Sequence, residues 1–315
     1  MKLKHEFPES FFKEEAKSFV VDCEMKRVWA ALLDLLAEFD RVCRKHDIKY
    51  SIDGGTMLGK VRHDGIIPWD DDIDVIITRP EYEKLLKVAE SEFKHPYFLQ
   101  TMQSDPEALR GHPQFRNSSM TAILKSEFKN GKAIYKSFNQ GLFMDVFVLD
   151  AIPDDPDERR SYFSRLEYLK YMMSFARSVK YKELSFGLSP RKFINFIRTA
   201  REKYRMARIR RSAGKDPMLY FEEEFDKACK KYMGQATHDV SHILFMPNPP
   251  DNRIVDRAKI EQIEDVDFMG LKVPMLKEYD YYLTLLYGNW HKYVIGGAKH
   301  GGLILDLENP YTEYF

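Results

Sequence analysis

The stretch that decides the fold runs from Ile67 to Ile77 and reads Ile-Pro-Trp-Asp-Asp-Asp-Ile-Asp-Val-Ile-Ile. Four carboxylates occupy the five positions 70–74, directly before an apolar run. In a strand, side chains alternate between the two faces, so we expect Asp72 and Asp74 on one face. Like charges this close repel each other unless a cation neutralises them. Carboxylates that converge and leave room for water and phosphate oxygens suit Mg²⁺.

Two further features point to the same chemistry. The turn Gly54-Gly55-Thr56 ends eleven residues before Ile67, and such a turn can present backbone N–H groups to phosphate oxygens at a helix start. Asp145 interrupts the otherwise apolar run 142–149, where an unpaired carboxylate is costly to bury. Asp145 is either a satisfied structural aspartate or a third metal-binding or base carboxylate on a neighbouring strand, and the second explains it better. Together these parts predict a metal-dependent phosphoryl-transfer site.

Two simpler explanations of the acidic cluster fit the sequence less well. A solvated surface loop is not expected to adjoin a β-rich, buried run such as 75–77. An EF-hand loop beginning at Asp70 would require glycine at its sixth position, where this chain has Val75. Pro80 would also fall inside that loop, so we reject a calcium site of this kind.

Composition narrows the class of protein. The chain has 315 residues with 49 Lys+Arg and 49 Asp+Glu, so no global field favours nucleic acid or a membrane, and we expect no nucleic-acid partner. The first 25 residues contain no apolar h-region, and no stretch approaches the length of a transmembrane helix. The three cysteines are scattered and indicate neither a disulfide framework nor a zinc site. We therefore expect a cytoplasmic protein.

The periodicity of the chain predicts mixed α and β structure. Apolar residues at helical spacing predict a helix over 26–46, and alternation predicts a strand over 48–52. Further predicted elements are helices over 56–62, 80–93 and 277–287, extended segments over 114–124 and 142–149, and a hairpin over 263–275 that turns at Met269-Gly270. We divide the chain into a catalytic core over 1–153, a basic helical insertion over 154–239, and a C-terminal part over 240–315. The C-terminal part would complete the core and the side of the site that binds the acceptor of the phosphoryl group.

The helical insertion carries a concentrated positive charge. Residues 191–215 contain ten basic residues and one acid, Glu202. Such a run is either a solvated helix face or a contact for an anionic partner: a phosphorylated acceptor, a lipid-linked saccharide or a membrane surface. Near the C-terminus, the glycine-rich segment 296–302 indicates either a flexible lid or a turn.

The motifs resemble those of a known family. Residues 53–63, Asp-Gly-Gly-Thr-Met-Leu-Gly-Lys-Val-Arg-His, followed by the acidic stretch, closely resemble the LicD family of bacterial phosphocholine transferases and fukutin-related proteins. The resemblance extends to 115–121, 141–147 and 273–288 but leaves out the helical insertion. It implies an α+β, nucleotidyltransferase-like fold in which a small mixed sheet is flanked by helices and carboxylates on adjacent strands hold Mg²⁺, with Mn²⁺ as the alternative ion.

The resemblance also implies roles for individual residues. Asp72, Asp74 and Asp145 would be catalytic and would hold the metal, and Asp70 would either take part or fix the loop. The residues implied to bind the phosphates of the donor are Gly54, Gly55, Thr56, Lys60, Arg62 and Arg116. The arginines would neutralise phosphate oxygens, which arginine does well through paired hydrogen bonds.

The function implied is a transferase that moves a phosphocholine-type group from a CDP-linked donor to a hydroxyl of a cell-surface glycan or its precursor. Its partners would be that donor and a sugar or lipid-linked saccharide, at the inner face of the membrane if 191–215 makes peripheral contact. One alternative is a nucleotidyltransferase that moves a nucleoside monophosphate, because the same metal site would serve. Another is a catalytically silent nucleotide-binding subunit.

Overall fold

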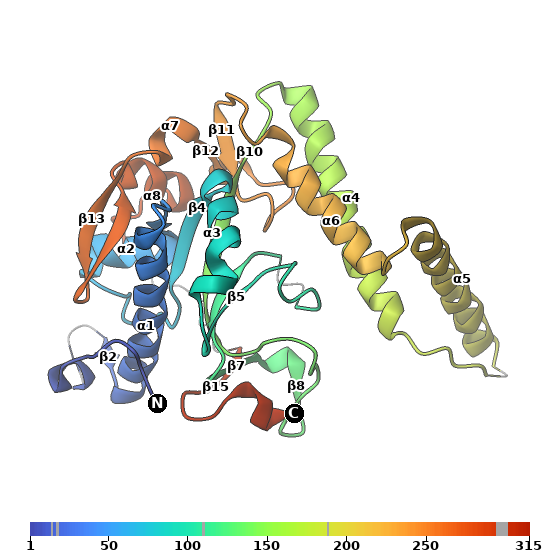
Figure 1. Cartoon of the computed structure of the whole chain (residues 1–315), viewed down its shortest axis with the longest axis horizontal. Helices are drawn as coiled ribbons and strands as arrows, with labels where there is room; N and C mark the ends of the chain where they lie inside the picture. The colour runs from blue at the N-terminus through green and yellow to red at the C-terminus, as the bar shows by residue number, and fades with distance from the viewer. Residues whose placement is uncertain (14, 17–18, 109–110, 188, 294–301) are drawn as a thin grey trace.

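The computed structural model describes residues 1–13, 15–16, 19–108, 111–187, 189–293 and 302–315 (Figure 1). Within these ranges the chain has the predicted α+β class, with a seven-stranded mixed sheet flanked by helices. The glycine-rich segment 296–302 lies outside the described residues except for Gly302.

The central pair of the sheet consists of two parallel strands, β4 (Asp74–Thr78) and β10 (Leu142–Ala151). All other neighbours in this sheet pair antiparallel. They are β3 (Ser51–Ile52) beside β4, β6 (Gln114–Asn117) beside the first half of β10, β5 (Tyr97–Gln100) beyond β6, β11 (Asp239–Ser241) beside the end of β10, and β12 (Ile254–Asp256) beyond β11.

The two faces of the sheet differ because side chains alternate along β10. Val146 and Val148 are buried on one face, whereas Asp145 and Phe147 are only half-buried on the other. The apolar face packs against α1 (Cys23–Lys45) and α3 (Arg79–Glu92), which Figure 1 shows in front of the strands. The other face is left for polar groups, and it carries Asp145.

Helices α2 (Gly54–His63) and α8 (Tyr279–Tyr287) pack together on the polar side of the sheet, and α2 also contacts β4. The ends of the helices follow local signals. The side chain of Asp22 caps α1 by accepting from the N–H of Met25 at 2.8 Å, and Gly288 ends α8 with φ +66°.

The helical insertion forms an arm that points away from the sheet (Figure 1). Helices α4 (Pro156–Tyr181) and α6 (Pro217–Cys229) pack side by side, and α5 (Pro190–Ala213) contacts both of them near the far end of the arm. The buried guanidinium of Arg79 bonds the carboxylate of Asp150 at 2.5 and 3.0 Å and reaches Asp226 of α6 at 3.3 Å. This ion pair joins the arm to the sheet.

The remaining elements are short. Hairpin β13–β14 turns at the predicted residues, Met269 (φ +51°) and Gly270 (φ +90°). A short helix, α7 (Arg257–Ile260), lies beside β12. The strands are β13 (Ile263–Phe268), β14 (Leu271–Leu276), β15 (Leu303–Asp306) on β7 (Thr121–Leu124), β8 (Phe128–Lys129) on β9 (Lys132–Ala133), and β1 (Glu15–Ala16) on β2 (Val20–Val21). No helix within the described residues is long and apolar enough to span a membrane.

Three predicted elements need correction. Strand β4 begins at Asp74, so Asp72 lies in the segment before the strand rather than within it. The strand predicted over 48–52 is limited to its last two residues. The extended segment 114–124 is two strands, β6 and β7, separated by a turn at 118–120 that sends them to different sheets.

Candidate active site

The two central strands bring two of the predicted carboxylates together. Asp74 is the first residue of β4, and Asp145 is its direct partner in the parallel pairing with β10. Asp72 and Asp70 approach from the segment that leads into β4, and both raise the electrostatic cost of ionising Asp74. We predicted that Asp72 and Asp74 share one strand face; the pair converges by way of the preceding loop instead.

The backbone around Asp74 is fixed at several points. Its N–H donates to Oγ1 of Thr56 at 2.9 Å, and its carbonyl accepts from the N–H of Asp53 at 2.9 Å. The N–H of Asp145 donates to the carbonyl of Ile73 at 3.1 Å. The hydroxyl of Thr56 thus holds the start of β4 against α2, and the predicted role of Thr56 in cradling phosphate stays a prediction.

The glycine pair lies directly against the carboxylates. Gly54 has φ +47°, and a Cβ built there would lie 3.4 Å from the hydroxyl of Tyr287 and 3.6 Å from Oδ2 of Asp74. A Cβ on Gly55 would lie 3.3 Å from Oδ2 of Asp70. At Gly54 the positive φ favours glycine, whereas at Gly55 an added methyl group would press on the carboxylate of Asp70. The N-terminal end of α2, where backbone N–H groups are not used by the helix itself, faces the acidic cluster.

The first residue before α2 leaves that helix end without a side-chain cap. The carboxylate of Asp53 makes no capping bond; its Oδ1 accepts from the hydroxyl of Tyr282 at 2.7 Å. The side chain of Asp53 thus does not occupy the first-turn N–H groups of α2, and binding of phosphate at Gly54 and Gly55 stays a prediction.

The electrostatics of Asp74 reflect crowding by like charges. Burial, and then the charges of Asp72 and Asp145, raise the pKa of Asp74 well above its usual range. Asp53 and Asp70 add to the effect. A carboxylate surrounded in this way ionises most readily when a cation lies between it and its neighbours.

Unlike Asp74, Asp145 has a lowered pKa, because neighbouring polar side chains stabilise its charged form. Gln114, its partner across the antiparallel pairing with β6, donates from Nε2 to Oδ1 at 2.6 Å. Nε2 of His112 lies 3.0 Å from the same oxygen. Although burial opposes ionisation, His112 and Gln114 hold the pKa of Asp145 below its usual range.

Arg116 does not have the predicted place in the site. Its side chain is 1% exposed, and its nitrogens donate to Oε1 of Gln100 at 2.6 Å, to the carbonyl of Gly141 at 2.6 Å and to Oε1 of Gln114. The prediction that Arg116 neutralises phosphate oxygens is therefore corrected: Arg116 orients Gln114, which in turn holds Asp145.

Lys60 and Arg62 also have other partners. They lie about 9 and 12 Å along the axis of α2 from Gly54, at a rise of about 1.5 Å per residue. Nζ of Lys60 pairs with Asp64, and the guanidinium of Arg62 lies over the ring of Tyr293 at 4.7 Å. Neither cation is paired with the carboxylates of the cluster, and their predicted contact with the donor phosphates stays a prediction.

A cavity of about 160 Å³ opens beside Asp74. Sequence reasoning missed most of its lining, because these residues come from distant segments. They include Phe147, His242, Phe245, Arg253 and Tyr287. Arg253 supplies the positive charge on this lining, and burial lowers the pKa of His242, whose ring stacks on Phe147 at 5.5 Å.

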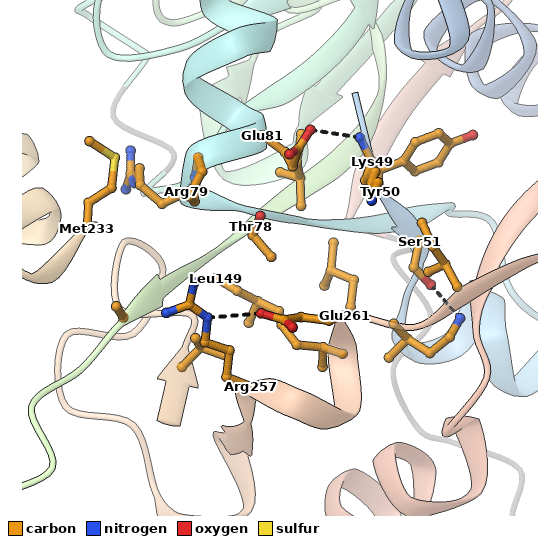
Figure 2. A pocket seen from close by; sticks show the side chains of 18 of the residues that line it. Lys49, Tyr50, Ser51, Thr78, Arg79, Glu81, Leu149, Met233, Arg257 and Glu261 are labelled. Atoms are coloured by element: carbon orange, nitrogen blue, oxygen red, sulfur yellow. Dashed lines mark hydrogen bonds and ion pairs between the residues drawn. The ribbon is translucent and has the colours of Figure 1, made fainter. Parts of the chain in front are cut away.

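A larger cavity, of about 370 Å³, lies at the other end of β4 (Figure 2). Ser51, Thr78 and Leu149 line it, together with Arg257 and Glu261, which form an ion pair at 3.2 Å. None of the predicted site residues lines this cavity. The smaller cavity is lined by two of them, Gly54 and Asp74, and is therefore the candidate site.

The predicted metal ligands form a suitable donor set that is not preassembled. No group of three His, Cys, Asp or Glu side chains in the described ranges is placed to hold a metal ion. The carboxylates of Asp70, Asp72 and Asp145 nevertheless surround Asp74 closely enough for their charges to affect its ionisation. Oxygen donors of this kind suit Mg²⁺, which would draw the side chains together.

Known proteins are similar to this part of the chain. The family LicD/FKTN/FKRP, nucleotidyltransferase domain, matches residues 47–157. The lipopolysaccharide cholinephosphotransferase LicD of Haemophilus influenzae is 33% identical over 124 residues, 39% of this chain and 43% of the relative. Uncharacterized proteins of Rickettsia prowazekii and Rickettsia typhi are each 49% identical over 45 residues, 14% of this chain and 17% and 15% of theirs. The chain thus spans less than half the length of these relatives.

Proposed function

Residues 47–157 belong to the LicD/FKTN/FKRP family of nucleotidyltransferase domains, and from this premise we propose that the chain is a Mg²⁺-dependent phosphotransferase. It would move a phosphocholine-type group from a CDP-linked donor to a hydroxyl of a glycan or its precursor. The single observation that carries the proposal is the pairing of Asp74 with Asp145 across adjacent strands, against the uncapped start of α2.

The reaction is a displacement at phosphorus. The acceptor oxygen forms a bond to the phosphorus that bears the alcohol, and the bond from that phosphorus to the bridging oxygen breaks. CMP leaves with the bridging oxygen, and the hydroxyl proton passes to a base. When bound, Mg²⁺, or Mn²⁺ in its place, would stabilise the charge on the phosphate oxygens, with Asp70, Asp72, Asp74 and Asp145 as its ligands.

The chain's own groups position the donor. Backbone N–H groups at Gly54 and Gly55 would bind the diphosphate, supported by the positive end of α2. Arg253 lines the cavity beside Asp74 and would neutralise phosphate oxygens, the role that Arg116 does not fill while it is bonded to Gly141. Phe147 and Tyr287 would shape the space for the transferred alcohol.

Asp145 is either the base or a metal ligand. Gln114 and His112 both engage its Oδ1. A carboxylate kept ionised is ready to take a proton or a cation, but a lowered pKa makes it a weaker base. If Asp145 is the base, Asp145→Asn should remove transfer and leave nucleotide affinity within a few-fold of wild type. If metal and nucleotide binding are lost as well, Asp145 is chiefly a ligand.

The products distinguish this function from its alternatives. The chain is incubated with CDP-choline, CDP-glycerol or CDP-ribitol and Mg²⁺, with and without sugar acceptors, and the nucleotide product and the modified acceptor are identified by mass spectrometry. Release of CMP with a phospho-alcohol on the acceptor supports the proposal. Transfer of CMP itself to the acceptor would make the chain a strict nucleotidyltransferase. Binding of nucleotide without turnover would make it a silent subunit.

We place this activity in a reducing compartment, with the cytoplasm as the expected one. Cys43 and Cys229 are buried and Cys23 is exposed, and all three are free thiols. The acceptor would be a sugar or a lipid-linked saccharide that carries a free hydroxyl.

A further inference from the structure

The far end of the helical arm exposes an unusual number of large apolar side chains. Ile194 and Tyr204 of α5 are 64% and 68% exposed. The segment before α5 continues the pattern with Leu184 and Phe186. Within α5 only Thr199 and Met206 are buried. The outer side of this helix is thus unpaired over most of its length.

The exposed residues form one face. At 100° per residue, Phe193, Ile194 and Tyr204 lie on the side of α5 opposite Thr199 and Met206. The ring of Phe186 meets those of Phe193 and Phe196 edge-on, with centroids 6.3 and 5.4 Å apart. We call the set Phe186, Phe193, Ile194, Arg201, Tyr204, Arg205 and Arg208 the outer face of α5.

The charge of the outer face is positive and unbalanced. Arg201, Arg205 and Arg208 are exposed, and no ion pair joins them to another residue in the described ranges. The acid within the run, Glu202, pairs with Lys182 at 2.6 Å. The whole chain carries equal numbers of acidic and basic residues, so the positive field is local to the arm.

We propose that the outer face of α5 docks on an anionic membrane surface. Aromatic and aliphatic side chains flanked by arginines on a helix of low mean hydropathy are the composition of helices that lie in the lipid headgroup region. A second copy of the chain would bring two positive faces together and is disfavoured by their repulsion. Nucleic acid would satisfy the arginines but leave Ile194 and Leu184 without apolar partners.

This inference goes beyond the proposed function and does not rest on it. Figure 1 shows α5 at the end of the arm remote from β4 and β10. The surface that meets the membrane is therefore separate from the cavity beside Asp74, and variants of the outer face leave the candidate active site unchanged.

The test is flotation of the full chain with vesicles of pure phosphatidylcholine and with vesicles of equimolar phosphatidylcholine and phosphatidylglycerol. The chain should bind the anionic vesicles and release them as salt is raised, since exposed charges are screened within about 8 Å at physiological ionic strength. The combined change Arg201→Gln, Arg205→Gln and Arg208→Gln should weaken binding on the order of 100-fold, at about fivefold for each cation near an anionic surface.

Two further variants keep the test specific. A matched control, Lys84→Gln with Lys87→Gln and Lys94→Gln, removes three exposed cations from the region of α3 and should change binding by less than about twofold. Phe193→Ser with Ile194→Ser keeps the charge but removes the apolar contact, and it should weaken binding more than about tenfold. Far-ultraviolet circular dichroism confirms that each variant keeps its helices.

The proposal is overturned if the chain does not bind anionic vesicles, or if it binds neutral and anionic vesicles equally. It is also overturned if the arginine variant binds as wild type does. Self-association through Phe193 and Ile194, or binding of RNA by the arginines, in a chain that does not bind vesicles would assign the outer face to those partners instead.

Discussion

Glu222 of α6 is a buried acid whose ionisation should oppose folding. It is 4% exposed, and its Oε1 has no hydrogen-bond partner among the described residues. Burial, with a contribution from Asp216, raises the pKa of Glu222 from 4.5 to about 8. Because the folded state holds the proton more tightly, Glu222 costs nothing below pH 4.5, and its cost to stability grows as the pH rises toward 8.

The size of the effect follows from about 1.36 kcal/mol for each unit of pKa difference. Between pH 5 and pH 7.5, ionisation of Glu222 should remove about 3 kcal/mol of unfolding free energy. Glu222→Gln keeps the shape of the side chain without the charge, so its stability should lack this part of the pH dependence.

Urea unfolding of wild type and Glu222→Gln at the two pH values measures the difference directly. The variant should be the more stable protein at pH 7.5, and the advantage should shrink by about 3 kcal/mol at pH 5. Parallel pH dependence of the two proteins would refute the assignment of a buried, neutral carboxyl at this position.

Arg79→Met should lower the free energy of unfolding by about 3–5 kcal/mol in urea, because Asp150 would stay buried without its partner; a loss below about 1 kcal/mol would contradict this. Gly54→Ala should cost about 1 kcal/mol because φ is +47°, and it should slow CMP release because the added methyl would lie 3.6 Å from Oδ2 of Asp74, beside the proposed phosphate site. Gln114→Asn, too short to reach Asp145, should lower kcat at least about tenfold with donor KM nearly unchanged. An unchanged kcat would remove Gln114 from the positioning of Asp145.

The parts of the site that were predictable depend on local sequence. The acidic stretch, the glycine turn and the lone aspartate in an apolar run are each recognisable within a few residues, and the structure brings them together. Parallel pairing of neighbouring strands then places Asp145 beside Asp74, because side-chain alternation puts both on the same face. The turn at Met269 and Gly270 was predictable for the same reason, since the chain reverses between two alternating runs.

The site residues that were predicted wrongly or missed have partners that are set by tertiary packing. Arg116 belongs to the motif, but whether an arginine meets ligand or protein is decided by what covers it, and here Gln100, Gln114 and Gly141 do. Arg253 gave no local signal because it reaches the cavity from η4 (Asp251–Arg253), far along the chain. His112 likewise meets Asp145 only through the fold.

The central claim is that the carboxylates around Asp74 hold a divalent cation that the reaction needs. The most direct measurement is Mg²⁺-dependent CMP release from the CDP-linked donor by wild type, Asp74→Asn and the matched control Asp71→Asn. Asp71 carries the same charge within the same stretch but lines a different cavity, with Asp22 and Asp306. We predict no turnover in EDTA or with Asp74→Asn, with the fold intact, and substantial turnover with Asp71→Asn. Full activity in EDTA, or in Asp74→Asn, would contradict the account.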